Sequence, residues 1–141
     1  VLIGEKNNHE YFAHKYSISN ETKENLNLLA KDFKLVKENK NFFDKDLEKN
    51  IYLADKNHLI KLNILNFVND YKYKLKNFSE IFKRIIKANV HLFTIDGKYL
   101  MQNGMKEGSA LGKVLKIIEK EWILNGFKIS KERIKEIIKS N

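Results

Sequence analysis

The chain has 141 residues and contains neither proline nor cysteine. Hydrophobic residues make up 43% of it, enough for a packed core, which excludes the disordered class. Without cysteine there can be no disulfide, thiolate catalysis or cysteine-based zinc site, and a cytosolic (cytoplasmic) location fits. Lysine or asparagine interrupts every apolar stretch before it reaches the roughly 18 residues of a membrane span, so we expect no membrane association.

The net charge of +9 at pH 7 favours a phosphate-bearing partner. A basic surface attracts nucleic-acid backbones through Coulomb forces and the release of counterions. Almost all of this charge is lysine, because Arg84 and Arg133 are the only arginines. Lysine, asparagine and isoleucine are also what an AT-rich genome encodes in excess. Charge therefore favours nucleic-acid binding without identifying it.

The first two thirds of the chain predict four helices. Ser19 is a suitable N-cap, and a second helix is expected to start at the cap Asp44. Two further helices are expected at about 56–71 and 78–89, followed by a short extended segment at 90–95. The apolar residues that recur at helical spacing in the first helix are Leu26, Leu29, Ala30, Phe33 and Val36.

The last third predicts a short helix at 97–103, a glycine-bearing turn and a long amphipathic helix at 109–125. Gly126 is expected to stop the long helix, and Ser130 is expected to cap a final one, with Ile129 and Ile134 as its hydrophobic staple. The fold class is therefore all-α, a helical bundle with antiparallel neighbours.

The predicted organisation has three parts. An N-terminal remnant covers 1–15, a helical body covers 16–95, and a helical tail with the glycine turn covers 96–141. Only one of the six glycines, Gly4, precedes the tail. The glycines, which can end or interrupt helices, are therefore concentrated where the tail helices meet.

The glycine turn is the most informative segment, and it resembles a helix-hairpin-helix. Gly104 can end one helix in a left-handed conformation, and Gly108 permits a tight entry into the next. Gly112 lies inside that second helix, where glycine costs about 1 kcal/mol relative to alanine, which predicts close contact with another backbone. Free amides at the helix start could hold a phosphate. The alternative is two packed helices that bind no ligand. The candidate RNA-binding residues are Lys98, Gly104, Lys106, Gly108, Ser109, Gly112 and Lys113.

The segment resembles the tail of bacterial tRNA nucleotidyltransferases, the CCA-adding enzymes and their poly(A) polymerase relatives. Residues 119–123 with Phe127 are similar to the ending of alphaproteobacterial members, and residues 18–20 are similar to the opening of a helix after that family's catalytic region. The likeness spans 16–138. Tyr99 and Glu107 depart from it, standing where the family usually has aspartate and proline. The matching residues are Gly97, Leu100, Gly104, Met105, Gly108, Leu111, Gly112 and Leu115.

The resemblance implies a tRNA-binding carboxy-terminal portion that lacks the catalytic head. In that family the head holds paired aspartates with metal ions, a neck selects CTP or ATP, and helical body and tail regions grip tRNA. This chain is then expected to hold no catalytic residue and no cofactor, since Mg²⁺ and CTP or ATP belong to the missing head. Its partners would be tRNA or other RNA and a separately encoded head chain. The valine at position 1 fits a split product or a fragment, and a degraded gene is the remaining alternative.

No other pattern predicts catalysis or metal binding. Asp44 and Asp46 have the D-x-D spacing of a metal site, but no strand pattern surrounds them, so we expect Asp44 to be a helix N-cap and Asp46 to be a favourable charge near the positive helix end. The four histidines do not have zinc-ligand spacing. The lysines and tyrosines of 70–76 could stack on unpaired bases, or they could form a solvated helix end. Trp122, at helical spacing, is expected in the core.

Two alternatives from other classes stay open. The chain could be a stand-alone helical module that binds nucleic acid, including DNA through a helix-hairpin-helix. It could also be an adaptor whose apolar helix stripes dock a protein partner.

Overall fold

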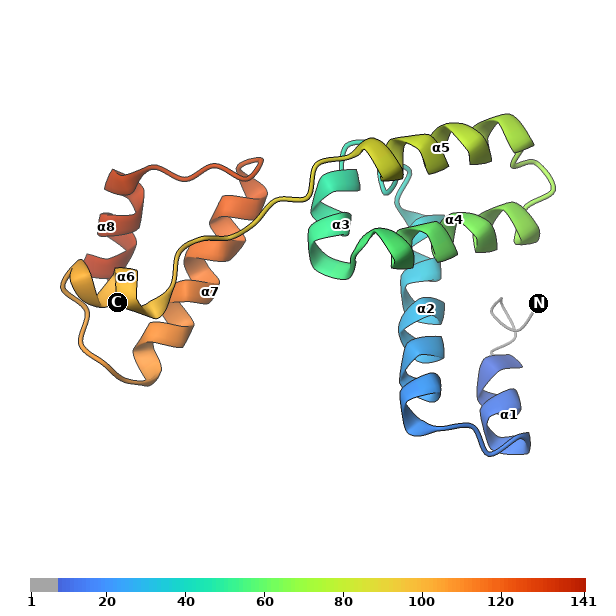
Figure 1. The fold of residues 1–141 in the computed structure, drawn as a ribbon, viewed down its shortest axis with the longest axis horizontal. Coiled ribbons are helices and arrows are strands. Elements are labelled where there is room, and N and C mark those ends of the chain that lie inside the picture. Colours follow the sequence, from blue (N-terminus) through green and yellow to red (C-terminus); the bar gives the residue numbers. More distant parts are fainter. Residues whose placement is uncertain (1–7) are drawn as a thin grey trace. The chain divides into compact units, whose positions relative to one another are not determined.

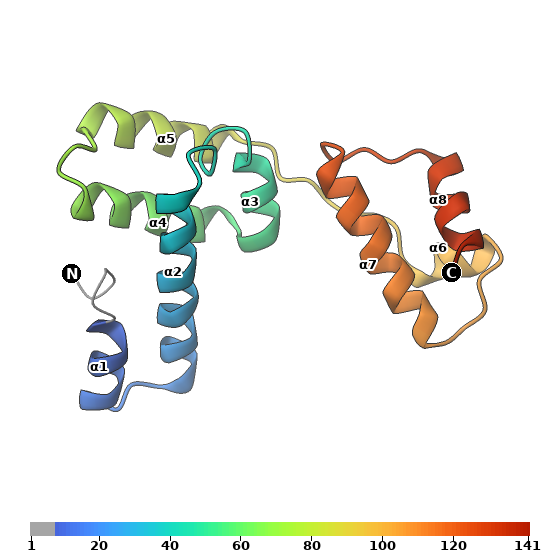
Figure 2. The same cartoon turned by 180° about the vertical axis from the view of Figure 1, so that it is seen from behind.

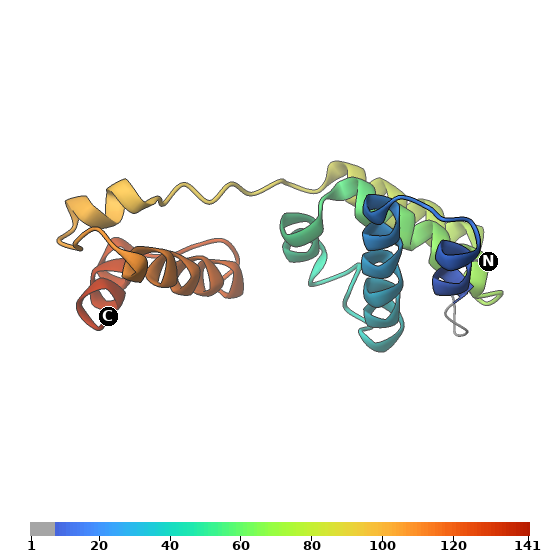
Figure 3. The ribbon, with the colours of Figure 1, turned by 90° about the horizontal axis from the view of Figure 1, so that it is seen from below.

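A computed structural model describes residues 8–141, and within them it contains helices and no strand. This confirms the predicted all-helical fold. The chain divides into a first compact unit that ends at Val90 and a second that begins at His91 (Figures 1 to 3). The helices of the first unit are α1 (Asn8–Lys15), α2 (Asn20–Glu38), α3 (Leu47–Ala54), α4 (Lys56–Asn69) and α5 (Leu75–Lys87). Those of the second are α6 (Gly97–Gln102), α7 (Ser109–Leu124) and α8 (Lys131–Lys139).

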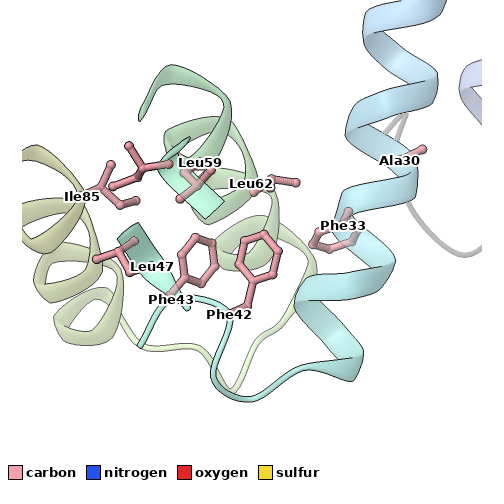
Figure 4. Packing of buried hydrophobic residues seen from close by; sticks show 9 residues of the cluster. Ala30, Phe33, Phe42, Phe43, Leu47, Leu59, Leu62 and Ile85 are labelled. Carbon is pink, nitrogen blue, oxygen red and sulfur yellow. The ribbon is translucent and has the colours of Figure 1, made fainter. Parts of the chain in front are cut away.

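Helix α4 is the centre of the first unit, because α2, α3 and α5 all pack against it. Figure 1 shows α4 and α5 side by side and antiparallel, joined by a short turn. Leu59 and Leu62 bring α4 into the core, where Ile85 of α5 meets them (Figure 4). The buried cluster consists of Ala30, Phe33, Phe42, Phe43, Leu47, Ile51, Leu59, Leu62 and Ile85.

Asn63 is a fully buried polar residue in this apolar environment. Its side-chain amide donates to the carbonyl of Phe78 at 3.1 Å, and its Oδ1 accepts from the Tyr73 hydroxyl at 2.8 Å. A buried amide without such partners would cost free energy, so both bonds are required at this position. Asn63 thereby ties α4 to the start of α5 and to the turn between them.

The first-unit helix starts agree with the sequence at Ser19 and differ at Asp44. The Ser19 hydroxyl accepts from the amide of Thr22 at 3.2 Å, which confirms the predicted N-cap. The predicted cap at Asp44 is wrong, because α3 begins only at Leu47. The Asp44 carboxylate instead accepts from the Arg84 guanidinium of α5 at 2.7 Å.

The difference at Asp44 follows from two neighbouring phenylalanines. Residues 40–46 form turns rather than helix, and Phe42 and Phe43 both enter the core from them, with ring centroids 5.1 Å apart. Burial of two consecutive aromatic rings outweighs a cap, which contributes about 1 kcal/mol. The helix consequently starts after the turns.

Helix α1 is an element that the sequence patterns do not predict. It packs on α2 and buries His9 and Ala13, which are one helical turn apart. Histidine is not counted as an apolar residue, so the helical spacing of apolar residues in this short segment is weak.

The second unit is built on α7, against which α6 and α8 pack. Ser130 accepts from the amide of Arg133 at 3.1 Å, and Ile129 and Ile134 join the same cluster, as predicted. Gly126 ends α7 with a φ of +64°, also as predicted. The buried residues of this core are Leu100, Val114, Ile118, Ile134 and Ile137.

The Tyr73–Asn63 hydrogen bond generates a prediction about alkaline stability. Burial raises the pKa of the Tyr73 hydroxyl from 10.0 to about 12, against a smaller lowering effect of a hydrogen bond with Asn66. The unfolded chain therefore releases this proton more readily than the folded chain does. Stability from Tyr73 is fully present below pH 10 and declines as the pH rises toward 12.

Ultraviolet titration of the phenolates in the folded chain tests this directly. We expect one tyrosine to ionise later than the others, and Tyr73→Phe to remove that late step. Tyr71→Phe is the matched control, because Tyr71 is 86% exposed. If the late step survives in Tyr73→Phe, burial of this hydroxyl is not its cause.

Candidate nucleic-acid interface

The α6–α7 turn begins with a Schellman motif at the end of α6. The amide of Met105 donates to the carbonyl of Leu100 at 3.1 Å, and the amide of Gly104 donates to the carbonyl of Met101, also at 3.1 Å. Gly104 has a φ of +99°, which confirms the predicted left-handed helix end. Leu100 and Met105 both pack into the second core, so the motif has its usual hydrophobic contact.

Helix α7 then begins without a side-chain cap. Gly108 occupies the N-cap position with a φ of 153°, and it has no side chain that could accept from the first turn. The backbone amides of residues 106–110 have no acceptor among the residues that the structure describes. Residues 106–110 are all exposed, whereas Met105 just before them is half-buried. The turn therefore presents consecutive free N–H groups next to the positive end of a helix.

All seven predicted RNA-binding residues are exposed. The structure brings Gly104, Lys106, Gly108 and Ser109 together in one turn. Lys98 is the second residue of α6, and the rest of that helix, roughly 6 Å at 1.5 Å per residue, separates it from the turn. The remaining two, Gly112 and Lys113, lie in the first turns of α7.

The charges of the three candidate lysines are not neutralised by neighbouring side chains in the described range 8–141. Lys98, Lys106 and Lys113 form no side-chain hydrogen bond or ion pair with any residue in the described range 8–141. Glu107 is the single acidic residue between Gly104 and Lys113. Residues 91–141 contain ten lysines and arginines against six aspartates and glutamates, which gives a net charge of +4. The turn thus lies in a basic unit and retains its own positive charges.

The two arginines, by contrast, are committed to the fold. Arg133 of α8 forms a bidentate pair with Glu121 of α7, with nitrogen–oxygen distances of 2.7 and 3.1 Å, and it also contacts Glu136 at 3.0 Å. The hydrogen bond from Arg133 lowers the pKa of the Glu121 carboxyl. Arg84 pairs with Asp44 as described above. Any attraction of phosphate by this chain must therefore come mainly from lysine.

Gly112 differs from its prediction. A Cβ built at this position would meet no atom within 4 Å apart from the helix's own backbone, so the predicted close approach of another backbone is wrong. Gly112 is exposed, whereas Val114 and Ile118 turn the other side of α7 into the core. No packing contact with the residues at 8–141 explains this glycine.

The segment 70–76, which contains the interleaved lysines and tyrosines, forms a turn followed by the start of a helix. Helix α4 ends at Asn69 and α5 begins at Leu75, earlier at both points than the sequence indicates. Tyr73 is held by Asn63, so only Tyr71 offers a free ring here, with Lys72 5.7 Å from its centroid. A single ring is a small stacking platform.

Trp122 packs within the second unit rather than offering a free face. Its ring lies 5.3 Å from Phe93 and 5.0 Å from Phe127, while Phe127 stacks on His91 at 3.7 Å. This cluster fastens the segment at 91–93 to the end of α7.

No metal centre or membrane span is found in the part of the chain that the structure describes. Histidine, cysteine, aspartate and glutamate nowhere gather in a group of three or more that could bind a metal ion. The Asp46 carboxylate accepts from Asn39 at 2.9 Å, and Asp44 is held by Arg84. None of the helices in 8–141 combines the length and the apolar character needed to cross a bilayer.

Comparison with family models, with curated proteins and with solved structures finds no match for this chain. The likeness to the tRNA nucleotidyltransferase tail therefore rests on the residues named above.

The contrast between Gly112 and Gly104 generates a stability prediction. We expect Gly112→Ala to raise the unfolding free energy of the second unit by about 1 kcal/mol, since alanine is the better helix former and space is open. We expect Gly104→Ala to lower it by roughly 1–2 kcal/mol, because a Cβ is disfavoured at positive φ.

Urea denaturation followed by tryptophan fluorescence is the measurement. Trp122 is the only tryptophan, so the signal reports on the second unit. Equal effects of the two substitutions, or a decrease of stability in Gly112→Ala, would show that the two positions are not distinguished by backbone conformation.

Proposed function

We propose that this chain binds the phosphate backbone of RNA through the α6–α7 turn. The observation that supports the proposal is the run of free amides at 106–110, which ends at the start of α7 between Lys106 and Lys113. Amides at a helix start form hydrogen bonds with phosphate oxygens, and nearby ammonium groups add Coulomb attraction. Recognition of this kind reads backbone and shape, not base sequence.

We further propose that the RNA is tRNA and that the chain corresponds to the body and tail of a tRNA nucleotidyltransferase. The glycines and leucines of 97–115 support this, because they are similar to the tail of that family. The helix–turn–helix form of 97–124 is compatible with such a tail. In this proposal the chain holds tRNA, and a head on a separate chain supplies Mg²⁺, CTP or ATP and the transfer reaction.

The tRNA-binding prediction uses Lys106→Ala/Lys113→Ala. Each lysine–phosphate interaction removed should reduce the slope of log K against log salt by about 1, so the double variant should lose about 2, and binding should weaken uniformly across RNA sequences. We expect tenfold or greater weakening at low salt, measured by gel shift or fluorescence anisotropy with tRNA. The matched control is Lys23→Ala/Lys45→Ala, which removes the same charge from exposed positions of the first unit.

Two outcomes would contradict the proposal. Undetectable tRNA binding at low salt would exclude RNA as a partner. Equal weakening by both double variants would show attraction by net charge alone, without a site at the turn. Competition between tRNA and duplex DNA for the chain distinguishes RNA binding from DNA binding by a helix-hairpin-helix. We expect tRNA to be the stronger competitor.

The proposed division of labour predicts that the purified chain adds no nucleotide to tRNA. Incubation with tRNA, Mg²⁺ and labelled CTP or ATP should leave the RNA unlabelled, because the proposal assigns the metal-binding aspartates to the separate head. Co-expression with a head-containing chain should restore incorporation. Labelling by the chain alone would contradict the headless assignment.

A further inference from the structure

The α4–α5 hairpin exposes large apolar side chains that are not part of the buried cluster of the first core. Six large apolar side chains, three from each helix, are between 37% and 65% exposed. We call them the hairpin face. They are Ile64, Phe67 and Val68 of α4 and Leu75, Phe82 and Ile86 of α5.

Helical spacing groups these side chains into one row on each helix, and ring contacts connect the two rows at Phe67 and Phe82. Residues 64, 67 and 68 share a side of α4, and residues 75, 82 and 86 share a side of α5. Phe78, half-buried between the helices, joins the two rows, with ring centroids 5.1 Å from Phe67 and 6.3 Å from Phe82. Single exposed apolar residues are ordinary, but a connected group of this kind marks an interaction site.

The surroundings of the hairpin face are strongly basic. Residues 56–88 contain eight lysines and arginines against only Asp70 and Glu80, which is a net +6 of the chain's +9, and of these cations Arg84 is paired with Asp44. Lys76, Lys83 and Lys87 each follow a hairpin-face residue of α5 by one position, so they border its apolar row. These three lysines form no side-chain hydrogen bond or ion pair within the described residues. The border therefore attracts acidic groups.

We propose that the hairpin face docks an amphipathic helix of a partner protein, whose apolar stripe is bordered by aspartate and glutamate. Two antiparallel helices form a shallow groove into which a third helix can lay its apolar side. The lysine border then pairs with the acidic flanks of that helix, which fixes its orientation and speeds its association. This proposal is independent of RNA binding by the α6–α7 turn.

The composition of the face favours this occupant over two others. Four of the six side chains are aliphatic and offer no stacking platform, and the phenylalanine rings pack against one another through Phe78, which disfavours RNA bases. A second copy of the chain would bring lysine borders together, and such like-charge pairs are unfavourable.

Designed peptides provide the probe. The test peptide is a helix with a leucine stripe flanked by glutamates. One control peptide has lysines in place of the glutamates, and another has the same composition as the test peptide in scrambled order. We expect the full chain to bind the test peptide at least tenfold more tightly than either control, as measured by fluorescence anisotropy. Rising salt should weaken the complex.

Variants locate the site. Val68→Asn/Ile86→Asn alters positions that are 57% and 51% exposed, so the core is left intact. We expect this variant to bind the test peptide at least tenfold more weakly while its circular dichroism and tRNA binding are unchanged. The matched control, Leu28→Asn/Leu124→Asn, removes exposed leucines from other helices and should retain peptide affinity.

Four results would overturn the proposal. Unchanged peptide affinity in Val68→Asn/Ile86→Asn would show that the peptide does not bind the hairpin face. Equal affinity for the scrambled peptide and the test peptide would show attraction by charge alone. Binding to anionic phospholipid vesicles, abolished by the double variant in the absence of test-peptide binding, would assign the face to a membrane surface. Self-association abolished by the same variant, again without peptide binding, would assign it to a second copy.

Discussion

Gly104 reverses the chain between α6 and α7, and the arrangement of the second unit depends on this reversal. A φ of +99° lets the amides of residues 104 and 105 return to the carbonyls of the last turn of α6. Leu100 is then fully buried, and Met105 packs against the same core. With these two anchors set, residues 106–108 cross to α7 in solvent, and the amides of residues 106–110 find no acceptor in the described part of the protein. A single backbone conformation thus creates both the hydrophobic core contact and the exposed turn.

Cations are divided between structure and surface in both units. Arg133 and Arg84 hold helices through carboxylates, while Lys106 and Lys113 pair with no residue in 8–141. Guanidinium groups suit fixed bidentate contacts, and ammonium groups on flexible stems suit backbone phosphates that vary in position. The proposed RNA contact at the turn and the proposed helix partner on the hairpin face use the same lysine chemistry at separate places in the sequence.

Features fixed by local chemistry are the ones that the sequence predicts. The caps at Ser19 and Ser130 and the helix ends at Gly104 and Gly126 depend on residues within one turn of each site. Asp44 is mispredicted because Phe42 and Phe43, in the same turn, are buried against residues distant in the sequence, and that burial decides the conformation of the segment. Exposure and distant packing are harder to infer from a pattern. The expected close approach at Gly112 would have required knowledge of what lies opposite the residue, and none of the residues that the structure describes lies there. The apolar residues of the hairpin face recur at the same helical spacing as those of a core stripe, so the pattern alone does not distinguish an exposed row from a buried one. In the structure α4 already buries Leu59, Leu62 and Asn63 on its other side, which leaves this row exposed. The candidate lysines are predicted as exposed because lysine almost always is.

Backbone amide resonances recorded while tRNA is added to the full chain test the central claim most directly. The amides of residues 106–110 should shift first and furthest, with Lys113 following, and added salt should reverse the shifts. Shifts confined to the first unit, or spread evenly over all exposed lysines, would contradict the assignment of the α6–α7 turn as the site that holds RNA.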